Sequence, residues 1–225
     1  YFKDTIEGKT FVVSGFGNVA WGTVKKITEL GGKVVTISGP DGYVYDADGV
    51  STEEKINYML EMRASCRNRV EDYADKFGVP FFPGKKPWEV KVDVAMPCAT
   101  QNEIDVEDAV RIIANGAGYY VEAANMPATA EALKLLRLSP KILTAGAKAA
   151  GSGGVVVSAL EMAQNSIRYS WTRKEVDERL RAIMSSIYDA SAAAAEEYGL
   201  GYDLIAGNDI ASFKRIAQAM MAQGL

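Results

Sequence analysis

The chain has 225 residues, of which 48% are apolar, and a formal net charge of −4. This length suits one large or two small domains, and the apolar content permits a sizeable core. The mildly acidic charge argues against nucleic acid or an anionic membrane as the main partner, and no apolar run approaches the ~18 residues of a membrane span. No signal peptide is visible, although the chain begins at Tyr1 rather than Met.

Histidine and cysteine usage narrows the possible chemistry. Histidine is absent, which excludes Ser-His-Asp and Cys-His catalysis and the HExxH metal site. Cys66 and Cys98 are too few for a disulfide framework and lack metal-ligand spacing, so we expect reduced thiols in a cytoplasmic protein. Cys98 is predicted to be a small buried hydrophobe; the alternative is a reactive thiol.

The first forty residues predict a βαβ unit. The run "KTFVVSG" from Lys9 to Gly15 is typical of a buried parallel strand. Apolar residues then recur at helical spacing from Asn18, and the pair Gly31-Gly32 ends the helix. The run Lys33 to Ser38 predicts a second buried strand, joined to the first by a right-handed crossover.

The next fifty residues are more irregular. The stretch "GYVYDADG" indicates a small hairpin. Ser51 with Glu54 fits a capping box, which predicts a helix through Met62. A further helix is expected from Arg67 to Phe77, ending at Gly78, and "GVPFFPGKKPWE" is expected to be irregular because it contains three prolines.

Strands and helices alternate in the rest of the chain. Strands are predicted for "VKVDVAMP", "YYVEA" and "KILTAG", and helices for "EIDVEDAVRIIANG" and for "PATAEALKLLRL", with Pro127 near its start. From Gly153 the pattern is helical, in "GGVVVSALEMAQNSIRYS", "TRKEVDERLRAIMSSIYDASAAAAEEYG" and "DIASFKRIAQAMMAQ". We therefore predict an α/β fold with a doubly wound, Rossmann-like, mostly parallel sheet, helices on both faces and C-terminal helices. The expected domains are 1–207 for dinucleotide binding and 208–225 for a C-terminal helix.

The sequence "GFGNVA" follows the first predicted strand and opens the first helix, and it fits the pattern GxGxxA. Gly15 permits the tight turn, Gly17 lets the backbone approach a pyrophosphate, and Ala20 lets helix and strand pack closely. The helix N-terminus offers free N–H groups and a partial positive charge to phosphates. Dinucleotide binding is favoured on this context, and a purely structural turn is the alternative.

The second predicted strand ends in "SGPDG", where an adenosine ribose is expected to bind. Asp41 could accept hydrogen bonds from ribose hydroxyls, and it would repel a 2′-phosphate by roughly 3 kcal/mol at ~5 Å and an effective dielectric near 20. The stretch itself holds no Lys or Arg to pair with such a phosphate. These features favour NAD over NADP. Asp41 nevertheless lies further from the glycine loop than the ~20 residues at which the ribose-binding acidic residue usually follows. The alternative is that Pro40-Asp41-Gly42 is simply a turn.

Several longer strings resemble the C-terminal, nucleotide-binding half of hexameric bacterial glutamate dehydrogenases. They are "GKTFVVSGFGNVAWG", "SGPDGYVYD", "EKINYMLEMRAS", "MPCATQN", "EAANMPAT", "SGGVVVSALEMAQNS" and "AAAAEEYGLGYDLIAG", and they span nearly the whole chain in family order. The resemblance is closest to the NAD-using members, because of Phe16 in the glycine loop and Pro40-Asp41 after the second strand.

The resemblance implies an activity for a longer protein. Enzymes of this family interconvert L-glutamate with 2-oxoglutarate and ammonia, passing a hydride between the substrate Cα and nicotinamide C4 through an imine. They have two domains with a cleft between them and assemble as homo-hexamers. The N-terminal domain carries the catalytic lysines and aspartate, so this chain is expected to hold no catalytic residue. No metal site is expected in it either. Its last helix is expected to return toward that absent domain.

The resemblance also implies roles for individual residues. Those expected at the pyrophosphate are Gly15, Phe16, Gly17, Asn18 and Val19; near the adenosine ribose, Pro40 and Asp41; beside the coenzyme after a strand, Ala99, Thr100 and Gln101; near the nicotinamide ribose, Asn125; and at the glutamate side chain, Val155 and Ser158. For Val155 and Ser158 the alternative is an ordinary buried helix face.

One departure from the family concerns "KAAGSGGV", where the family usually has "KAANAGGV". Gly151 stands where an asparagine would contact the nicotinamide carboxamide, a loss of about 1 kcal/mol for one neutral hydrogen bond. We expect the chain alone to bind NAD(H) without turnover. The alternatives are the coenzyme domain of another amino-acid dehydrogenase, acting on leucine, valine or phenylalanine, and a non-catalytic nucleotide-binding module.

Overall fold

The structure is a computed structural model that describes residues 4–224. The chain divides into two compact units, Tyr1–Leu143 and Thr144–Leu225. The expected boundary between residues 207 and 208 falls inside helix α9 (Leu204–Ala222), so the structural division comes much earlier in the chain. Across residues 4–224, no helix combines the length and the apolar character that crossing a membrane requires.

A five-stranded sheet has four of its strands in the first unit, and its last strand begins at Leu143, where that unit ends. Its order is β2 (Lys33–Val34), β1 (Thr10–Val13), β6 (Val94–Met96), β7 (Tyr119–Val121) and β8 (Leu143–Ala145). The pairings of β1 with β2, β1 with β6, and β6 with β7 are all parallel. The predicted α/β class with a mostly parallel sheet is therefore confirmed.

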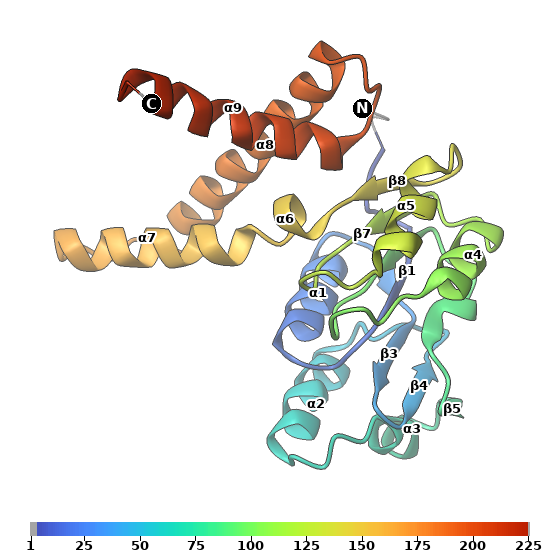
Figure 1. Cartoon of the computed structure of the whole chain (residues 1–225). Helices are drawn as coiled ribbons and strands as arrows, with labels where there is room; N and C mark the ends of the chain where they lie inside the picture. The colour runs from blue at the N-terminus through green and yellow to red at the C-terminus, as the bar shows by residue number, and fades with distance from the viewer. Residues whose placement is uncertain (1–3, 225) are drawn as a thin grey trace. The chain divides into compact units, whose positions relative to one another are not determined.

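Successive strand residues point to opposite faces of this sheet, and helices cover both faces. Phe11 and Val13 belong to a buried cluster that includes residues of α1 (Asn18–Glu29), α2 (Glu53–Ala64) and α3 (Glu71–Phe77). Val12 belongs to a second cluster, with residues of α4 (Val106–Ala114), α5 (Ala130–Leu138) and the short 3₁₀ helix η1 (Pro87–Glu89). The doubly wound arrangement is visible in Figure 1, with α1 and α4 on opposite sides of β1.

A second sheet contains strands that the sequence analysis placed differently. It consists of β3 (Thr36–Gly39), β4 (Gly42–Tyr45) and β5 (Phe81–Pro83), and both pairings are antiparallel. The single strand expected over Lys33–Ser38 is thus two strands in two sheets, while the expected hairpin is the β3–β4 pair. The stretch expected to be irregular contains β5, which tolerates Pro83 because it is an edge strand.

Several helix starts also differ from expectation. Helix α2 is capped by Thr52, whose hydroxyl accepts from the Lys55 N–H at 3.2 Å, so Ser51 is not the capping residue. Helix α3 begins at Glu71 rather than at Arg67, and it ends as predicted at Gly78, which has φ +66°. Helix α5 is capped by Thr129, so Pro127 precedes this helix instead of opening it.

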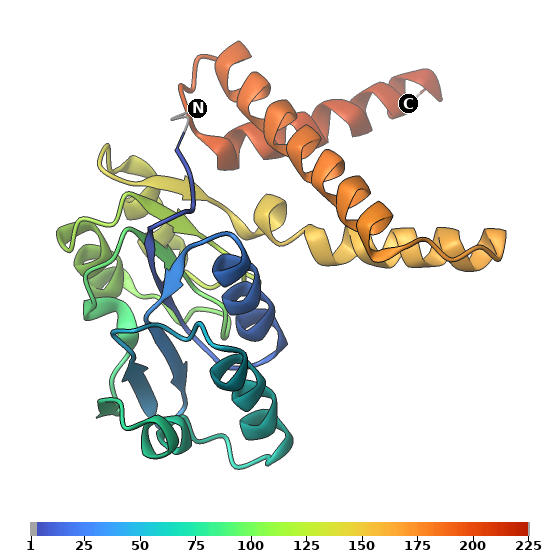
Figure 2. The ribbon, with the colours of Figure 1, turned by 180° about the vertical axis from the view of Figure 1, so that it is seen from behind.

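The second unit is helical. It contains α6 (Ala147–Ala150), which was not predicted, α7 (Gly153–Ile167), α8 (Arg173–Glu197) and α9. Thr172 caps α8 in a reciprocal capping box with Glu175. Helix α9 begins at Leu204, earlier than the predicted Asp209, because the Asp203 carboxylate accepts from the Ala206 N–H and caps it there. Helices α8 and α9 cross in close contact, as Figure 2 shows.

Candidate functional site

A cavity of about 550 Å³ lies in the first unit beside the ends of β1, β3 and β6. Ligand sites in parallel α/β sheets form at these carboxyl ends, and this volume is in the range of small-molecule sites. Six of the predicted coenzyme residues line it: Gly15, Phe16, Gly17, Pro40, Ala99 and Thr100. The other lining residues are Ser38, Gly39, Arg63, Asn68, Lys85, Lys86, Pro87, Trp88, Cys98 and Glu103.

The two loop glycines differ in what they permit. Gly15 has φ +80°, and a Cβ there would lie 3.2 Å from the Cα of Ala99, so both conformation and space favour glycine. Gly17 has φ −75°, and a Cβ would meet nothing within 4 Å. Its lack of a side chain therefore leaves open space at the N-terminus of α1, where no side chain caps the helix. The free N–H groups of the first turn can thus bind an anion.

The opposite wall is the turn that follows β6. The Cys98 N–H donates to the Ser14 hydroxyl at 2.9 Å, which ties this turn to the end of β1. The Cys98 thiol is buried, as predicted, and burial raises its pKa to about 12. A thiol with so high a pKa stays protonated at neutral pH and is a poor nucleophile.

Glu103 on this wall was missed by the sequence analysis. Its Oε1 accepts from the N–H groups of Ala99 at 3.1 Å and Thr100 at 3.3 Å. Burial raises the pKa of its carboxyl, and these two N–H groups, the Ser14 hydroxyl and the Lys86 charge oppose that rise. The sequence signal was present: "TQNE" has the T-x-x-E spacing of a capping box, in which the glutamate reaches back to the backbone N–H of the threonine.

Asp41 takes part in the fold beside the cavity but does not line it. Its carboxylate oxygens accept from the N–H groups of Val70 and Glu71, each at 3.0 Å, and so hold the start of α3. Each oxygen keeps one further lone pair for another donor. The ribose contact predicted for Asp41 stays a prediction, and its position in the β3–β4 turn also fits the alternative of a structural turn.

Three cations also line the cavity, Arg63, Lys85 and Lys86. Lys85 pairs with Glu89 at 3.2 Å, and Lys86 pairs with Asp108 at 2.6 Å and with Asp105 at 3.2 Å. The Arg63 side chain has no acceptor within residues 4–224. No spacing in the sequence brings these residues together, because they come from α2 and from the segment before η1.

The remaining predicted coenzyme residues lie around the cavity rather than in its lining. Asn18 and Val19 open α1, and Gln101 follows Thr100 in an exposed turn. Asn125 lies in the segment after β7, which runs beside that turn because the Asn102 N–H donates to the Met126 carbonyl at 3.0 Å. Their contacts with a coenzyme stay predictions.

Val155 and Ser158, the predicted substrate residues, belong to α7 in the second unit. Both are exposed, Val155 by 74%. The alternative that they form an ordinary buried helix face is therefore wrong for the described chain. Gly151 ends α6, and a Cβ there would lie 2.7 Å from the Ala147 carbonyl oxygen. The asparagine usual in the family would need a backbone shift at this point.

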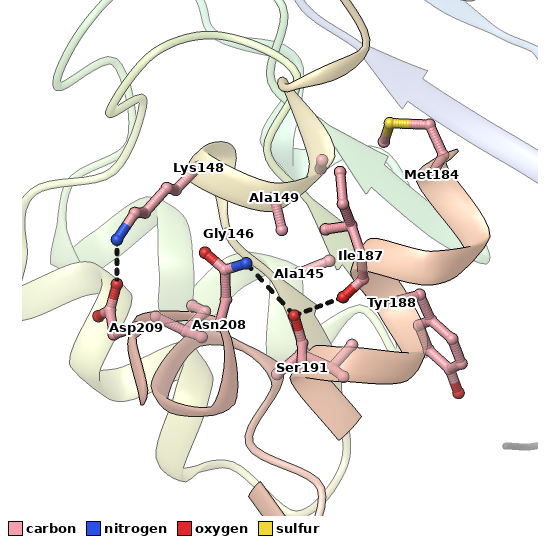
Figure 3. Close-up of a pocket in the computed structure, with 13 residues that line it drawn as sticks. Ala145, Gly146, Lys148, Ala149, Met184, Ile187, Tyr188, Ser191, Asn208 and Asp209 are labelled. Carbon is pink, nitrogen blue, oxygen red and sulfur yellow. Dashed lines mark hydrogen bonds and ion pairs between the residues drawn. The ribbon is translucent and has the colours of Figure 1, made fainter. Parts of the chain in front are cut away.

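The second unit has a smaller cavity of its own, about 140 Å³, between α6, α8 and α9 (Figure 3). Asn208 donates to the Ser191 hydroxyl at 3.3 Å, and that hydroxyl donates to the Ile187 carbonyl at 2.7 Å. Lys148 pairs with Asp209 at 2.8 Å at its edge. The cavity is too small for a dinucleotide and contains none of the predicted coenzyme residues.

Metal ligation has no support in the geometry. Residues 4–224 contain no group of three or more Cys, Asp and Glu side chains placed to hold an ion.

Comparison with known sequences identifies relatives along the whole chain. The Glutamate/Leucine/Phenylalanine/Valine dehydrogenase family matches residues 1–224. The NAD-specific glutamate dehydrogenase of Clostridium symbiosum is 63% identical over 223 residues, which is 99% of this chain and 50% of that protein. The NADP-specific glutamate dehydrogenase of Haemophilus influenzae is 46% identical over 227 residues, 99% of this chain and 49% of that protein.

Solved structures agree with the sequence comparison. A glutamate dehydrogenase structure superposes with a TM-score of 0.97 at 63% identity, covering 99% of this chain and 49% of that one. The Plasmodium falciparum glutamate dehydrogenase gives a TM-score of 0.92 at 40% identity, covering 98% and 47%. The chain therefore spans about half the length of the relatives it matches.

Proposed function

The chain belongs to the Glutamate/Leucine/Phenylalanine/Valine dehydrogenase family, and we propose that it is the coenzyme-binding half of an NAD-dependent glutamate dehydrogenase. One observation carries the proposal. The uncapped N-terminus of α1, the open space over Gly17 and the turn at Gly15 all border one cavity of about 550 Å³.

Binding of the coenzyme by this chain follows from the chemistry of that cavity. The N–H groups at the start of α1 would take the pyrophosphate, since they are free and lie at the positive end of the helix dipole. Pro40 would lie at the adenosine ribose, with Asp41 behind it, and Ala99 and Thr100 would flank the coenzyme on the opposite wall. When bound, the nicotinamide ring supplies hydride transfer.

We propose NAD as the preferred coenzyme because Asp41 places a carboxylate near the ribose end and several relatives are named NAD-specific. Arg63 opposes this preference, because it offers a cation without an acceptor at the same cavity. At ~5 Å each charge acts on a 2′-phosphate by roughly 3 kcal/mol with opposite sign, so the two effects largely cancel. The expectation that NADH binds more tightly than NADPH therefore rests on the relatives named NAD-specific.

L-glutamate and 2-oxoglutarate are proposed as substrates of the longer, homo-hexameric and cytoplasmic protein, with Val155 and Ser158 exposed on α7 to receive the glutamate side chain. Hydride transfer requires donor and acceptor at ~3–3.5 Å, and one coenzyme-binding half holds only one of the two. The chain alone is therefore expected to bind NAD(H) without turnover. Glutamate-dependent NADH formation by the pure chain would contradict this.

Calorimetric titration with NADH and NADPH tests the proposal, with two glycine variants as a matched pair. Gly17→Ala puts a methyl group where we place the pyrophosphate, and nothing in the fold opposes that methyl group. We expect at least about a tenfold loss of NADH affinity, or about 1.4 kcal/mol. Thermal stability should fall only slightly, because Gly17 is the N-cap of α1 and alanine is less favoured than glycine at that position. Gly22→Ala, in the same helix and also open around its Cβ, should leave NADH binding unchanged. Equal NADH binding by Gly17→Ala and the unmodified chain would place the coenzyme elsewhere.

A further inference from the structure

We infer that Glu103 is a positioning residue of the coenzyme site, whose ionised carboxylate holds the turn of residues 98–100 against the glycine loop and makes coenzyme binding depend on that ionisation. The inference rests on the proposed function, since it concerns the same cavity. Glu103 itself lines the cavity from the segment after the turn.

The geometry of the turn requires an acceptor at this place. Ala99 and Thr100 present two consecutive N–H groups, and one oxygen of Glu103 accepts both, at 3.1 and 3.3 Å. The segment is not helical, because α4 begins only at Val106. No helix therefore fixes the backbone of this turn. The two hydrogen bonds that Glu103 accepts fix it instead.

The turn so fixed is in direct contact with the glycine loop. The Cys98 N–H donates to the buried Ser14 hydroxyl at 2.9 Å, and Ser14 immediately precedes Gly15. A Cβ on Gly15 would lie 3.2 Å from the Cα of Ala99, so the two backbones pack without a side chain between them. A displaced turn would therefore change the width of the cavity where the pyrophosphate is proposed to bind.

Ionisation of Glu103 is sensitive to its surroundings. Burial raises the pKa of this carboxyl, while the Ser14 hydroxyl, the N–H groups of Ala99 and Thr100, and the Lys86 charge lower it, and the net direction is upward. The other titratable groups that interact with it are Cys98 and Tyr120, whose pKa values its charge raises. Glu103 therefore gains a proton at a higher pH than an ordinary glutamate.

The direction of the pH effect follows from the donors that face the carboxylate. A protonated carboxyl accepts the two N–H groups through weaker, uncharged hydrogen bonds than a carboxylate does, so the turn is held less firmly. Coenzyme affinity should then fall as the pH is lowered through the pKa of Glu103. Stability moves the other way. Because the folded-state pKa is raised, the contribution of Glu103 to stability is largest below its unfolded pKa and is lost as the pH rises through the folded one.

Coenzyme affinity and stability are thus expected to change in opposite directions with pH, and this separates a positioning role from a merely structural one. If Glu103 only stabilised the fold, NADH affinity would follow stability and improve toward acid. Simple repulsion between the carboxylate and the anionic pyrophosphate would also improve affinity toward acid. Only the positioning role predicts that coenzyme binding weakens toward acid pH while the contribution of Glu103 to stability does not fall.

The test is a titration of the full chain with NADH between about pH 5 and pH 8, for the unmodified chain, Glu103→Gln and Glu103→Ala. The amide of Glu103→Gln keeps an oxygen for the two N–H groups and does not titrate. Since its oxygen is uncharged, like that of the protonated carboxyl, we expect it to bind NADH at every pH about as weakly as the unmodified chain does near pH 5, with no acid decline. Glu103→Ala should bind about tenfold more weakly throughout. Glu107→Gln, the same change at an exposed residue of α4, should keep the unmodified profile.

Two outcomes would overturn the inference: an acid decline that persists unchanged in Glu103→Gln, or an NADH affinity of the unmodified chain that rises toward acid. A circular-dichroism melting curve of each variant at each pH shows whether the affinities were measured on folded protein. Failure of the unmodified chain to bind NADH at any pH would contradict the proposed function itself, so the two failures are distinguishable.

Discussion

The two compact units bury different kinds of side chain. In the first unit, large apolar residues such as Val24, Ile37 and Tyr120 are fully buried on the two faces of the sheet. In the second unit, the buried residues of α8 and α9 are mostly small, and α7 has no buried residue. The folding free energy of the first unit is therefore spread over a core, whereas the second depends on one close crossing of helices.

This difference bears on function because the candidate coenzyme cavity lies in the first unit. Its glycine loop and the 98–100 turn follow β1 and β6, which the core holds on both faces. We therefore expect coenzyme affinity to depend strongly on the core of the first unit and little on the packing of α8 against α9. The following substitutions test this comparison.

Ile37→Ala should have the largest effect. Ile37 lies in β3 and is fully buried, and truncating such a residue costs about 3 kcal/mol because it removes apolar contacts and leaves a cavity. Urea denaturation followed by tryptophan fluorescence measures the loss, with Trp21 and Trp88 reporting on the first unit and Trp171 on the second. A loss of stability below about 1 kcal/mol would mean that neighbouring side chains move into the space left by the truncation. The packing of this core would then be less specific than its burial indicates.

Gly207→Ala should damage the second unit alone. A Cβ on Gly207 would collide with the carbonyl oxygen of Ser191, so α9 must move away from α8. We expect a cost of about 2 kcal/mol, seen as faster hydrogen exchange in α8 and α9, with NADH affinity unchanged. Gly154→Ala, on α7 with open space around its Cβ, is the matched control and should leave exchange in α8 and α9 unaltered. Weaker NADH binding in Gly207→Ala would show that the units are coupled.

The parts of the fold that the sequence predicted well are those determined by neighbours along the chain. The strand before Gly15, the helix from Asn18 and the end of that helix before Gly31 all follow from local periodicity and glycine placement. The glycine loop could be assigned for the same reason. Six of the predicted residues, from three separate segments, border one cavity because parallel strands end at the same edge of a sheet.

What could not be predicted depends on contacts between distant segments. β3 leaves the parallel sheet because it pairs with β4, which in turn pairs with β5, and Phe81 of β5 lies far along the chain from Val44, its partner. Arg63 reaches the cavity from the last turn of α2, a position that looks like ordinary charged surface in the sequence. Glu103 shows a capping-box spacing without the helix that usually accompanies it, so the pattern alone did not identify its role.

Val155→Ala should have the smallest effect on stability, and it tests the difference in burial between the two units at a single side chain. Val155 is 74% exposed on α7, so truncation removes few contacts, and alanine has the higher helix propensity. We expect a change within about 0.5 kcal/mol, toward higher stability. Val24→Ala is the same substitution in α1, where valine is fully buried, and should cost about 2 kcal/mol. If hydrogen exchange in α7 accelerated in Val155→Ala as much as exchange in α1 does in Val24→Ala, Val155 would be buried in solution and the contrast between the two units would not hold at α7.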